Sequence, residues 1–171
     1  GTWLDRFGSE DCQGRALLAL GIASREAPEV ALRRDARELF DLGLPAARRL
    51  TSPRAIASVI LGCDAALTGA ADVETERTFE GLVRRLAGSF EHVDLDCDWP
   101  WPEAALAYEN ALLPHALIVA GHRRGDVGLR RVGLATLDWL ITIQRSRKGM
   151  FTPVGNDGWW PRGGTRSRFD Q

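Results

Sequence analysis

The sequence predicts an all-α protein built from stacked antiparallel helical hairpins. Segments that are apolar on almost every side alternate three times with segments that are apolar on one side only. No strand-like alternation of apolar and polar residues extends over a useful length. The apolar segments begin near residues 11, 53 and 102, and a spacing of about 40 to 50 residues is typical of stacked helical pairs.

The helix boundaries follow from local signals. Glu10 and Asp11 suit the start of a first helix, because unpaired N–H groups there favour negative charge. Ser52 is expected to cap the third helix, with Pro53 at its first position. The six expected helices span residues 11–24, 28–42, 53–67, 73–90, 102–121 and 126–145, and a loop rich in Gly, Pro and Trp follows over 149–171.

Two architectures fit this alternation, an α-solenoid and an α/α toroid. The toroid explains all-round apolarity better, because its inner helices contact neighbours on both sides and the outer layer as well. Residues 1–171 then form a single domain that covers three hairpins of a closed ring of about six. We therefore expect a fragment of a longer chain, or assembly with another chain, such as a homodimer.

The composition of the chain excludes several kinds of partner and indicates its location. With 22 basic and 23 acidic residues the net charge is -1, so neither nucleic acid nor a membrane surface is expected as a partner. No apolar run reaches transmembrane length. The three cysteines have no metal-ligand spacing, and their odd number favours a reducing, cytoplasmic location. We expect no metal and no cofactor.

Parallel inner helices would bring their first turns to one rim. Glu103, beside two tryptophans, is the first catalytic candidate, as a general acid in a cleft. Glu10 and Asp11 are candidates for the second carboxylate of a glycosidase-type pair. Each of the three also has a structural interpretation, in which the carboxylate only stabilises a helix N-terminus.

Aromatic and polar residues near the same rim are candidates for contacts with a sugar. Flat tryptophan rings stack on sugar faces, and amide or hydroxyl groups bind sugar hydroxyls. The structural alternatives are loop anchoring for the tryptophans and satisfaction of backbone groups for buried Tyr and Asn. The substrate-binding candidates are Trp99, Trp101, Tyr108, Asn110, Trp159, Trp160, Arg162 and Asp170.

Three motifs extend over nearly the whole chain. They are S-E-D-C-Q-G-R-A-L-L-A-L-G at 9–21, W-P-W-P-E at 99–103 with L-A-Y-E-N-A at 106–111, and G-M-F-T-P-V-G-N-D-G-W-W at 149–160 with F-D-Q at the end. In this order they resemble the motifs of a bacterial helical, toroid-like family, whose members are labelled glycosyltransferases or occur beside glycosyltransferases and mannoside-processing enzymes. Cys12 stands where Ser is commoner in that family, and Pro102 where Phe is commoner.

The resemblance implies a carbohydrate-active α/α-toroid domain, glycosyltransferase-associated or glycoside-hydrolase-like, that acts on or binds a glycan through paired carboxylates. The alternative is a non-catalytic helical-repeat scaffold that partners a glycosyltransferase. The first hypothesis predicts that Glu103 lies within about 10 Å of Glu10 or Asp11, as in glycosidase carboxylate pairs. It also predicts that the tryptophans border the same cavity.

Overall fold

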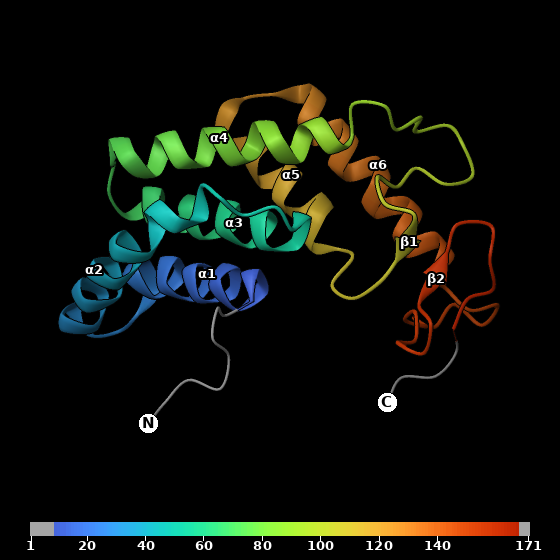
Figure 1. The fold of residues 1–171 in the computed structure, drawn as a ribbon, viewed down its shortest axis with the longest axis horizontal. Coiled ribbons are helices and arrows are strands. Elements are labelled where there is room, and N and C mark those ends of the chain that lie inside the picture. The colour runs from blue at the N-terminus through green and yellow to red at the C-terminus, as the bar shows by residue number, and fades with distance from the viewer. Residues whose placement is uncertain (1–8, 168–171) are drawn as a thin grey trace.

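The computed structural model of the chain describes residues 9–167, and residues 1–8 and 168–171 lie outside this part. Its regular elements are helices and one antiparallel pair of very short strands, so the predicted all-α class is confirmed (Figure 1). In chain order they are α1 (Glu10–Glu26), α2 (Val30–Ala47), α3 (Pro53–Gly69), α4 (Val73–Ser89), β1 (Ala105–Leu106), α5 (Leu112–Arg124), α6 (Val127–Ile143) and β2 (Trp160–Pro161).

Short polar side chains begin most of the helices. Ser9 accepts a hydrogen bond from the Cys12 N–H at the start of α1, and Asp72 accepts one from Thr75 N–H at the start of α4. Ser52 caps α3 as the sequence predicts, and Pro53 is the first residue of that helix. These caps satisfy N–H groups that have no acceptor inside the helix.

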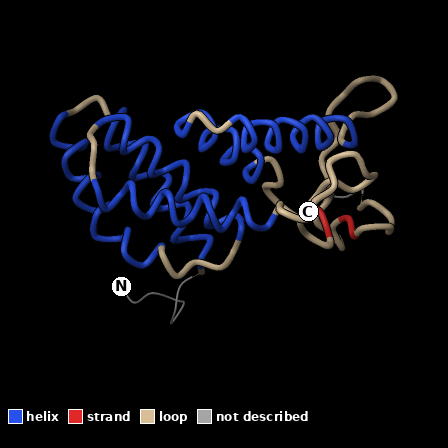
Figure 2. The backbone as a smooth tube through the Cα atoms, turned by 90° about the horizontal axis from the view of Figure 1, so that it is seen from above, coloured by secondary structure: helices blue, strands red, loops and turns tan. Residues whose placement is uncertain are grey.

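The helices form three successive hairpins, α1–α2, α3–α4 and α5–α6. The first helices of the hairpins, α1, α3 and α5, pack side by side in that order, and each also packs against its own hairpin partner (Figures 1 and 2). We call α1 to α6 the hairpin layer. Its three hairpins fit either of the two predicted architectures.

Glycines allow α1 to approach α3 closely. A Cβ atom on Gly14 would lie 2.8 Å from the Ala55 Cα, and one on Gly21 would lie 2.7 Å from the carbonyl carbon of Gly62. A Cβ on Gly62 would meet the Leu17 carbonyl oxygen at 2.6 Å. Real side chains do not tolerate such distances, so the two backbones touch because these positions carry no side chain.

Burial differs between the two helices of this interface. α3 is buried on almost every side, as its all-round apolarity predicts. α1 is not, because Ala16, Ala19 and Ile22 are exposed. We call these three residues the open face of α1.

One predicted helix starts in the wrong place. No helix begins at residue 102, and α5 starts only at Leu112. Pro114 is the third residue of α5, where its missing N–H costs nothing, but it would lie deep inside a helix over 102–121 and break it. Glu109 has a left-handed backbone with φ of 46°, which also excludes a helix through this position.

The segment before α5 instead belongs to a second unit, the loop lobe, which consists of residues 90–111 and 144–167. Figure 2 places these loops and the two short strands together at one end of the helices. Ala105 pairs with Pro161 and Leu106 with Trp160, and the Arg162 N–H donates to the Ala104 carbonyl over 2.8 Å. These bonds hold the two halves of the lobe together.

A group of aromatic rings, the tryptophan cluster, fills the lobe. The Trp99 ring lies edge-on to Trp139 of α6 at 5.4 Å and to Trp160 at 6.0 Å between centroids. Trp101 stacks on Trp139 at 6.4 Å and meets Phe90 edge-on. Trp99 and Trp101 are only 8% and 3% exposed, so both rings belong to the core. The prediction that they line the wall of a cleft is therefore wrong.

Candidate functional site

Arg54, in the first turn of α3, lies at the centre of a buried polar network although only 5% of its surface is exposed. Its Nε donates to the Tyr108 carbonyl oxygen over 2.6 Å, and its Nη1 donates to Glu103 Oε1 over 2.8 Å. Its Nη2 donates to Asn110 Oδ1 over 3.1 Å. The guanidinium also lies 4.8 Å from the centre of the Tyr108 ring. A buried arginine is tolerated because each of its nitrogens has an acceptor.

Both carboxylate oxygens of Glu103 are engaged by neighbours. Oε1 accepts from Arg54, and Oε2 accepts from the Trp101 indole N–H over 3.2 Å. The Glu103 main-chain carbonyl accepts from the Trp99 indole over 3.1 Å. In this arrangement Glu103 joins the tryptophan cluster to α3 and is not presented to a ligand as a free acid.

Glu10 joins α1 to the segment that precedes α3. Its carboxylate accepts hydrogen bonds from the Ser52 N–H, the Thr51 N–H and the Thr51 hydroxyl. The backbone N–H groups of Ser52 and Thr51 hold the pKa of Glu10 below its ordinary value, because they stabilise the charged form. These contacts give Glu10 a structural role, because it ties the two residues that precede α3 to the start of α1.

Contacts between Asp11 and Tyr108 connect α1 to the loop that precedes α5. Burial, together with a hydrogen bond to the Asp11 carboxylate, raises the pKa of Tyr108. Arg15 of α1 pairs with Glu109 over 3.0 Å and approaches Asp11 at 3.8 Å. The start of α1 therefore lies against Tyr108 and Glu109, in the segment that Arg54 holds through Tyr108 and Asn110.

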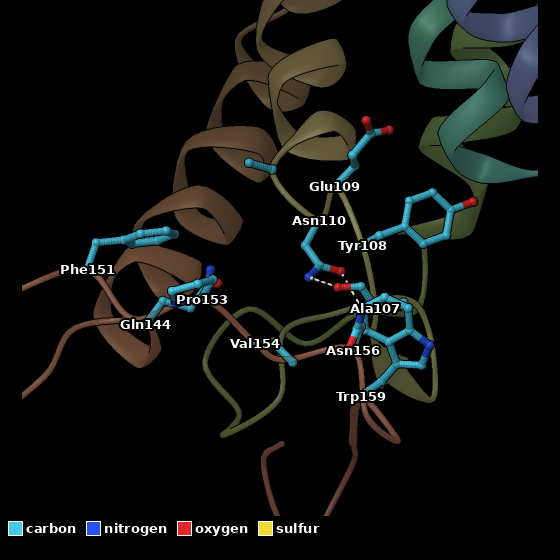
Figure 3. A pocket seen from close by; sticks show the side chains of 11 residues that line it. Ala107, Tyr108, Glu109, Asn110, Gln144, Phe151, Pro153, Val154, Asn156 and Trp159 are labelled. Carbon is cyan, nitrogen blue, oxygen red and sulfur yellow. Dashed lines mark hydrogen bonds between the residues drawn. The ribbon is translucent and has the colours of Figure 1, made fainter. Parts of the chain in front are cut away.

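An open cavity of about 480 Å³ lies beside this segment, between the start of α5, the end of α6 and the last loop (Figure 3). This volume falls within the range of small-molecule sites, about 300 to 1,000 Å³. Figure 3 shows Phe151, Pro153 and Gln144 on one side and Tyr108 and Trp159 on the other. The lining residues are Ala107, Tyr108, Glu109, Asn110, Ala111, Gln144, Phe151, Pro153, Val154, Asn156 and Trp159.

Backbone strain is concentrated at this cavity. Among the described residues, the non-glycine positions with positive φ are Glu109, at 46°, and Trp159, at 56°. Both line the cavity, and left-handed backbone at such residues costs about 1–3 kcal/mol each. Strain of this kind persists where the surroundings enforce it, and it occurs frequently at binding sites.

The structure brings three of the predicted sugar contacts together. Tyr108, Asn110 and Trp159 line this cavity, and the Tyr108 and Trp159 ring centres are 6.1 Å apart. Trp160 belongs to the tryptophan cluster and donates its indole N–H to the Gly164 carbonyl. Arg162 is exposed and contributes a backbone bond to the β1–β2 pair. Asp170 lies outside the described residues.

Glu10, Asp11 and Glu103 are not among the described residues that line the cavity. Glu10 contacts Thr51 and Ser52, and Glu103 contacts Arg54, so both lie against the first turn of α3 and the two residues before it. The two carboxylates have different partners, which are adjacent in the sequence, and the distance between Glu10 and Glu103 stays a prediction.

Sequence reasoning missed several residues of the site. Arg54 was not predicted as a site residue, although a lone arginine directly after the Ser52-Pro53 cap of a mostly apolar helix indicates a buried, partnered charge. Phe151 and Asn156 lie in the last of the three motifs but were not predicted as ligand contacts, and neither was Gln144, because a cavity assembled from three loop and helix ends has no sequence period.

In the described part of the chain, no group of three or more His, Cys, Asp or Glu side chains is placed to hold a metal ion. None of the described helices combines the length and the apolar character needed to span a bilayer. Comparison with protein-family models, with curated proteins and with solved structures finds no match to this chain.

Proposed function

We propose that the chain is a glycan-binding helical domain whose binding site is the cavity between α5, α6 and the last loop. The observation that carries this proposal is the composition of the cavity wall. Three aromatic side chains, those of Tyr108, Phe151 and Trp159, line a volume that also contains amide groups. Aromatic faces pack against the C–H faces of sugar rings, and a small number of placed polar groups fix orientation in such sites.

The polar groups suit hydroxyl recognition. Gln144 and Asn156 line the cavity, and side-chain amide groups both donate hydrogen bonds to sugar hydroxyls and accept from them. Phe151, which lines the cavity, exposes 70% of its surface. A ligand that covered Phe151 would remove this surface from water, which favours binding.

Binding fits the cavity better than paired-carboxylate catalysis. Glu103 and Glu10, two of the three catalytic candidates, are occupied by Arg54, Trp101, Ser52 and Thr51. The third, Asp11, approaches Arg15 at 3.8 Å, and it adds to the burial that raises the pKa of Tyr108. Glycosidase chemistry requires a protonated acid aimed at the leaving oxygen, and none of these three carboxylates is among the described residues that line the cavity.

A screen of neutral oligosaccharides on an array, followed by calorimetric titration of the strongest binder, tests the proposal. Trp159→Ala is expected to weaken binding about tenfold or more, because aromatic anchors dominate such sites. Leu42→Ala, an exposed apolar residue on α2, serves as the matched control and should leave affinity unchanged. The absence of any binder among neutral glycans, or equal affinity of the two variants, contradicts the proposal.

A second candidate function, a scaffold for a partner chain, is supported by the open face of α1. Ala16, Ala19 and Ile22 are exposed on a helix whose opposite side packs tightly on α3. Exposed apolar surface favours association. Sedimentation should then give a dimer that Ala19→Glu dissociates, and a monodisperse stable monomer of the unaltered chain contradicts this candidate.

A further inference from the structure

We infer that Arg54 is the positioning residue of the cavity: it does not contact the ligand, and it holds the cavity wall at Ala107 to Asn110 in its binding shape. This inference rests on the proposed function for the identity of the ligand. Arg54 itself is not among the described lining residues, whereas each of the four wall residues is.

The contacts of Arg54 converge on this wall. One nitrogen binds the main-chain carbonyl of Tyr108, and another binds the side chain of Asn110. The third binds Glu103, which is anchored in turn by the Trp101 indole. A guanidinium offers donors in a fixed planar fork, so three acceptors from one loop are held at fixed relative positions.

Asn110 passes this constraint along the wall. Its Oδ1 accepts from Arg54 and also from the Ala107 N–H over 3.0 Å, and its Nδ2 donates to the Ala107 carbonyl over 2.8 Å (Figure 3). The Asn110 side chain therefore binds both the N–H and the carbonyl of Ala107, as a neighbouring strand would. Between these two residues lies Glu109, whose left-handed backbone requires an enclosing set of bonds to persist.

The placement of Arg54 gives the wall a rigid support. Arg54 belongs to the first turn of α3, and α3 is the most completely buried helix of the described chain. A loop that is held by such a helix is already ordered before the ligand arrives. Preorganisation of this kind raises affinity because less conformational freedom is lost on binding.

Arg54→Lys is the direct test. Lysine keeps the positive charge beside Glu103, but its single ammonium group does not reproduce the planar fork to three acceptors. Hydrogen exchange at the Ala107 amide, which donates to Asn110, should become at least about tenfold faster. Amides of α1 such as Leu17 should exchange as before. The affinity for a neutral trisaccharide probe (mannotriose, maltotriose or cellotriose, whichever the unaltered protein binds) should fall at least about tenfold.

Arg123→Lys is the matched control. Arg123 also binds α3 from a distant part of the chain, through Asp64 Oδ1 over 2.6 Å, but it is not among the described residues that line the cavity, so Ala107 exchange and affinity should stay unchanged. If Arg54→Lys does not fold, the double variant Arg54→Met with Glu103→Gln replaces it, because no buried charge is then left unpaired. The same loss of protection at Ala107 is expected.

The results separate this inference from the proposed function. If no trisaccharide binds the unaltered protein, the proposed function fails, and the exchange data still decide whether Arg54 holds the wall. Unchanged Ala107 exchange in the Arg54 variants overturns the inference. Faster exchange with unchanged affinity overturns it as well, because the wall would then be held by Arg54 without being needed for binding.

Discussion

The hairpin layer and the loop lobe achieve dense packing in opposite ways. At the α1–α3 interface the backbones touch through Gly14, Gly21 and Gly62, and little side-chain volume lies between them. In the loop lobe, large rings fill the space between irregular loops, with Trp99 and Trp101 packed on Trp139 of α6. Mutations that add atoms at the α1–α3 interface should therefore destabilise the protein. In the loop lobe, the mutations that destabilise should be those that remove atoms.

This difference relates to what each region does for the cavity. Two helices in backbone contact have few alternative arrangements, so the layer gives a fixed frame for Arg54. The lobe carries the strained residues Glu109 and Trp159, and loops need large buried side chains to hold such conformations. Each side of the cavity is thus supported by a different kind of packing.

The largest expected effect comes from removal of a ring in the lobe. Trp101→Ala should lower the free energy of unfolding by about 3–5 kcal/mol, because it deletes a fully packed ring and leaves the Glu103 oxygen without its indole donor. Trp159→Ala, at the partly exposed cavity wall, should cost about 1 kcal/mol. Urea unfolding monitored by circular dichroism measures both, and equal losses for the two variants would remove the distinction between cluster and cavity wall.

The second effect tests the glycine contacts. In Gly21→Ala the new methyl group would overlap the backbone atoms of Gly62. This substitution should lower the free energy of unfolding by about 2–3 kcal/mol. Gly81→Ala on α4 is the matched control, because a Cβ there meets no atom within 4 Å, and it should raise stability by about 0.5–1 kcal/mol. The same unfolding titration decides, and a stabilising Gly21→Ala would contradict backbone contact between α1 and α3.

A third test compares how easily the two regions open. Burial raises the pKa of the Cys63 thiol on α3 to about 12, so it reacts only after the hairpin layer opens. Cys97 in the loop lobe is half-buried, and Cys12 on α1 is exposed. Labelling of the native protein with a thiol reagent should therefore follow the order Cys12, Cys97, Cys63. If Cys63 reacts as fast as Cys97, the layer is not the more rigid region.

The sequence was sufficient for the hairpin layer and insufficient for the lobe, for physical reasons. Helices have a period and their caps are local, so Ser52-Pro53 marks the start of α3 correctly. The start of α5 depends on distant contacts, since Arg54 holds Tyr108 and Asn110 from more than fifty residues away. Pro114 was the one local sign that a helix over 102–121 would fail.

The candidate site follows the same division. Tyr108, Asn110 and Trp159 were predicted as ligand contacts from residue type and position, and they line one cavity. Trp99 and Trp101 were given the same role from the same residue type, yet they are buried. A tryptophan in a loop serves equally well as a core residue or as a binding surface, and only the tertiary packing separates these two uses.

The smallest effect concerns the single carboxylate that links α1 to the loop before α3. The Ser52 and Thr51 N–H groups hold the pKa of Glu10 below its ordinary value of 4.5, so its stabilising contribution is present above that value. It is lost as the pH falls through the lower pKa of the folded state, because protonation weakens acceptance from both N–H groups. Glu10→Gln should lower the free energy of unfolding at pH 7 by about 1 kcal/mol. The difference between the two proteins should shrink as the pH is lowered from about 5 to 3. Thermal unfolding across this range checks the sign, and a difference that stays constant with pH would mean that Glu10 contributes only its shape to the α1–α3 interface.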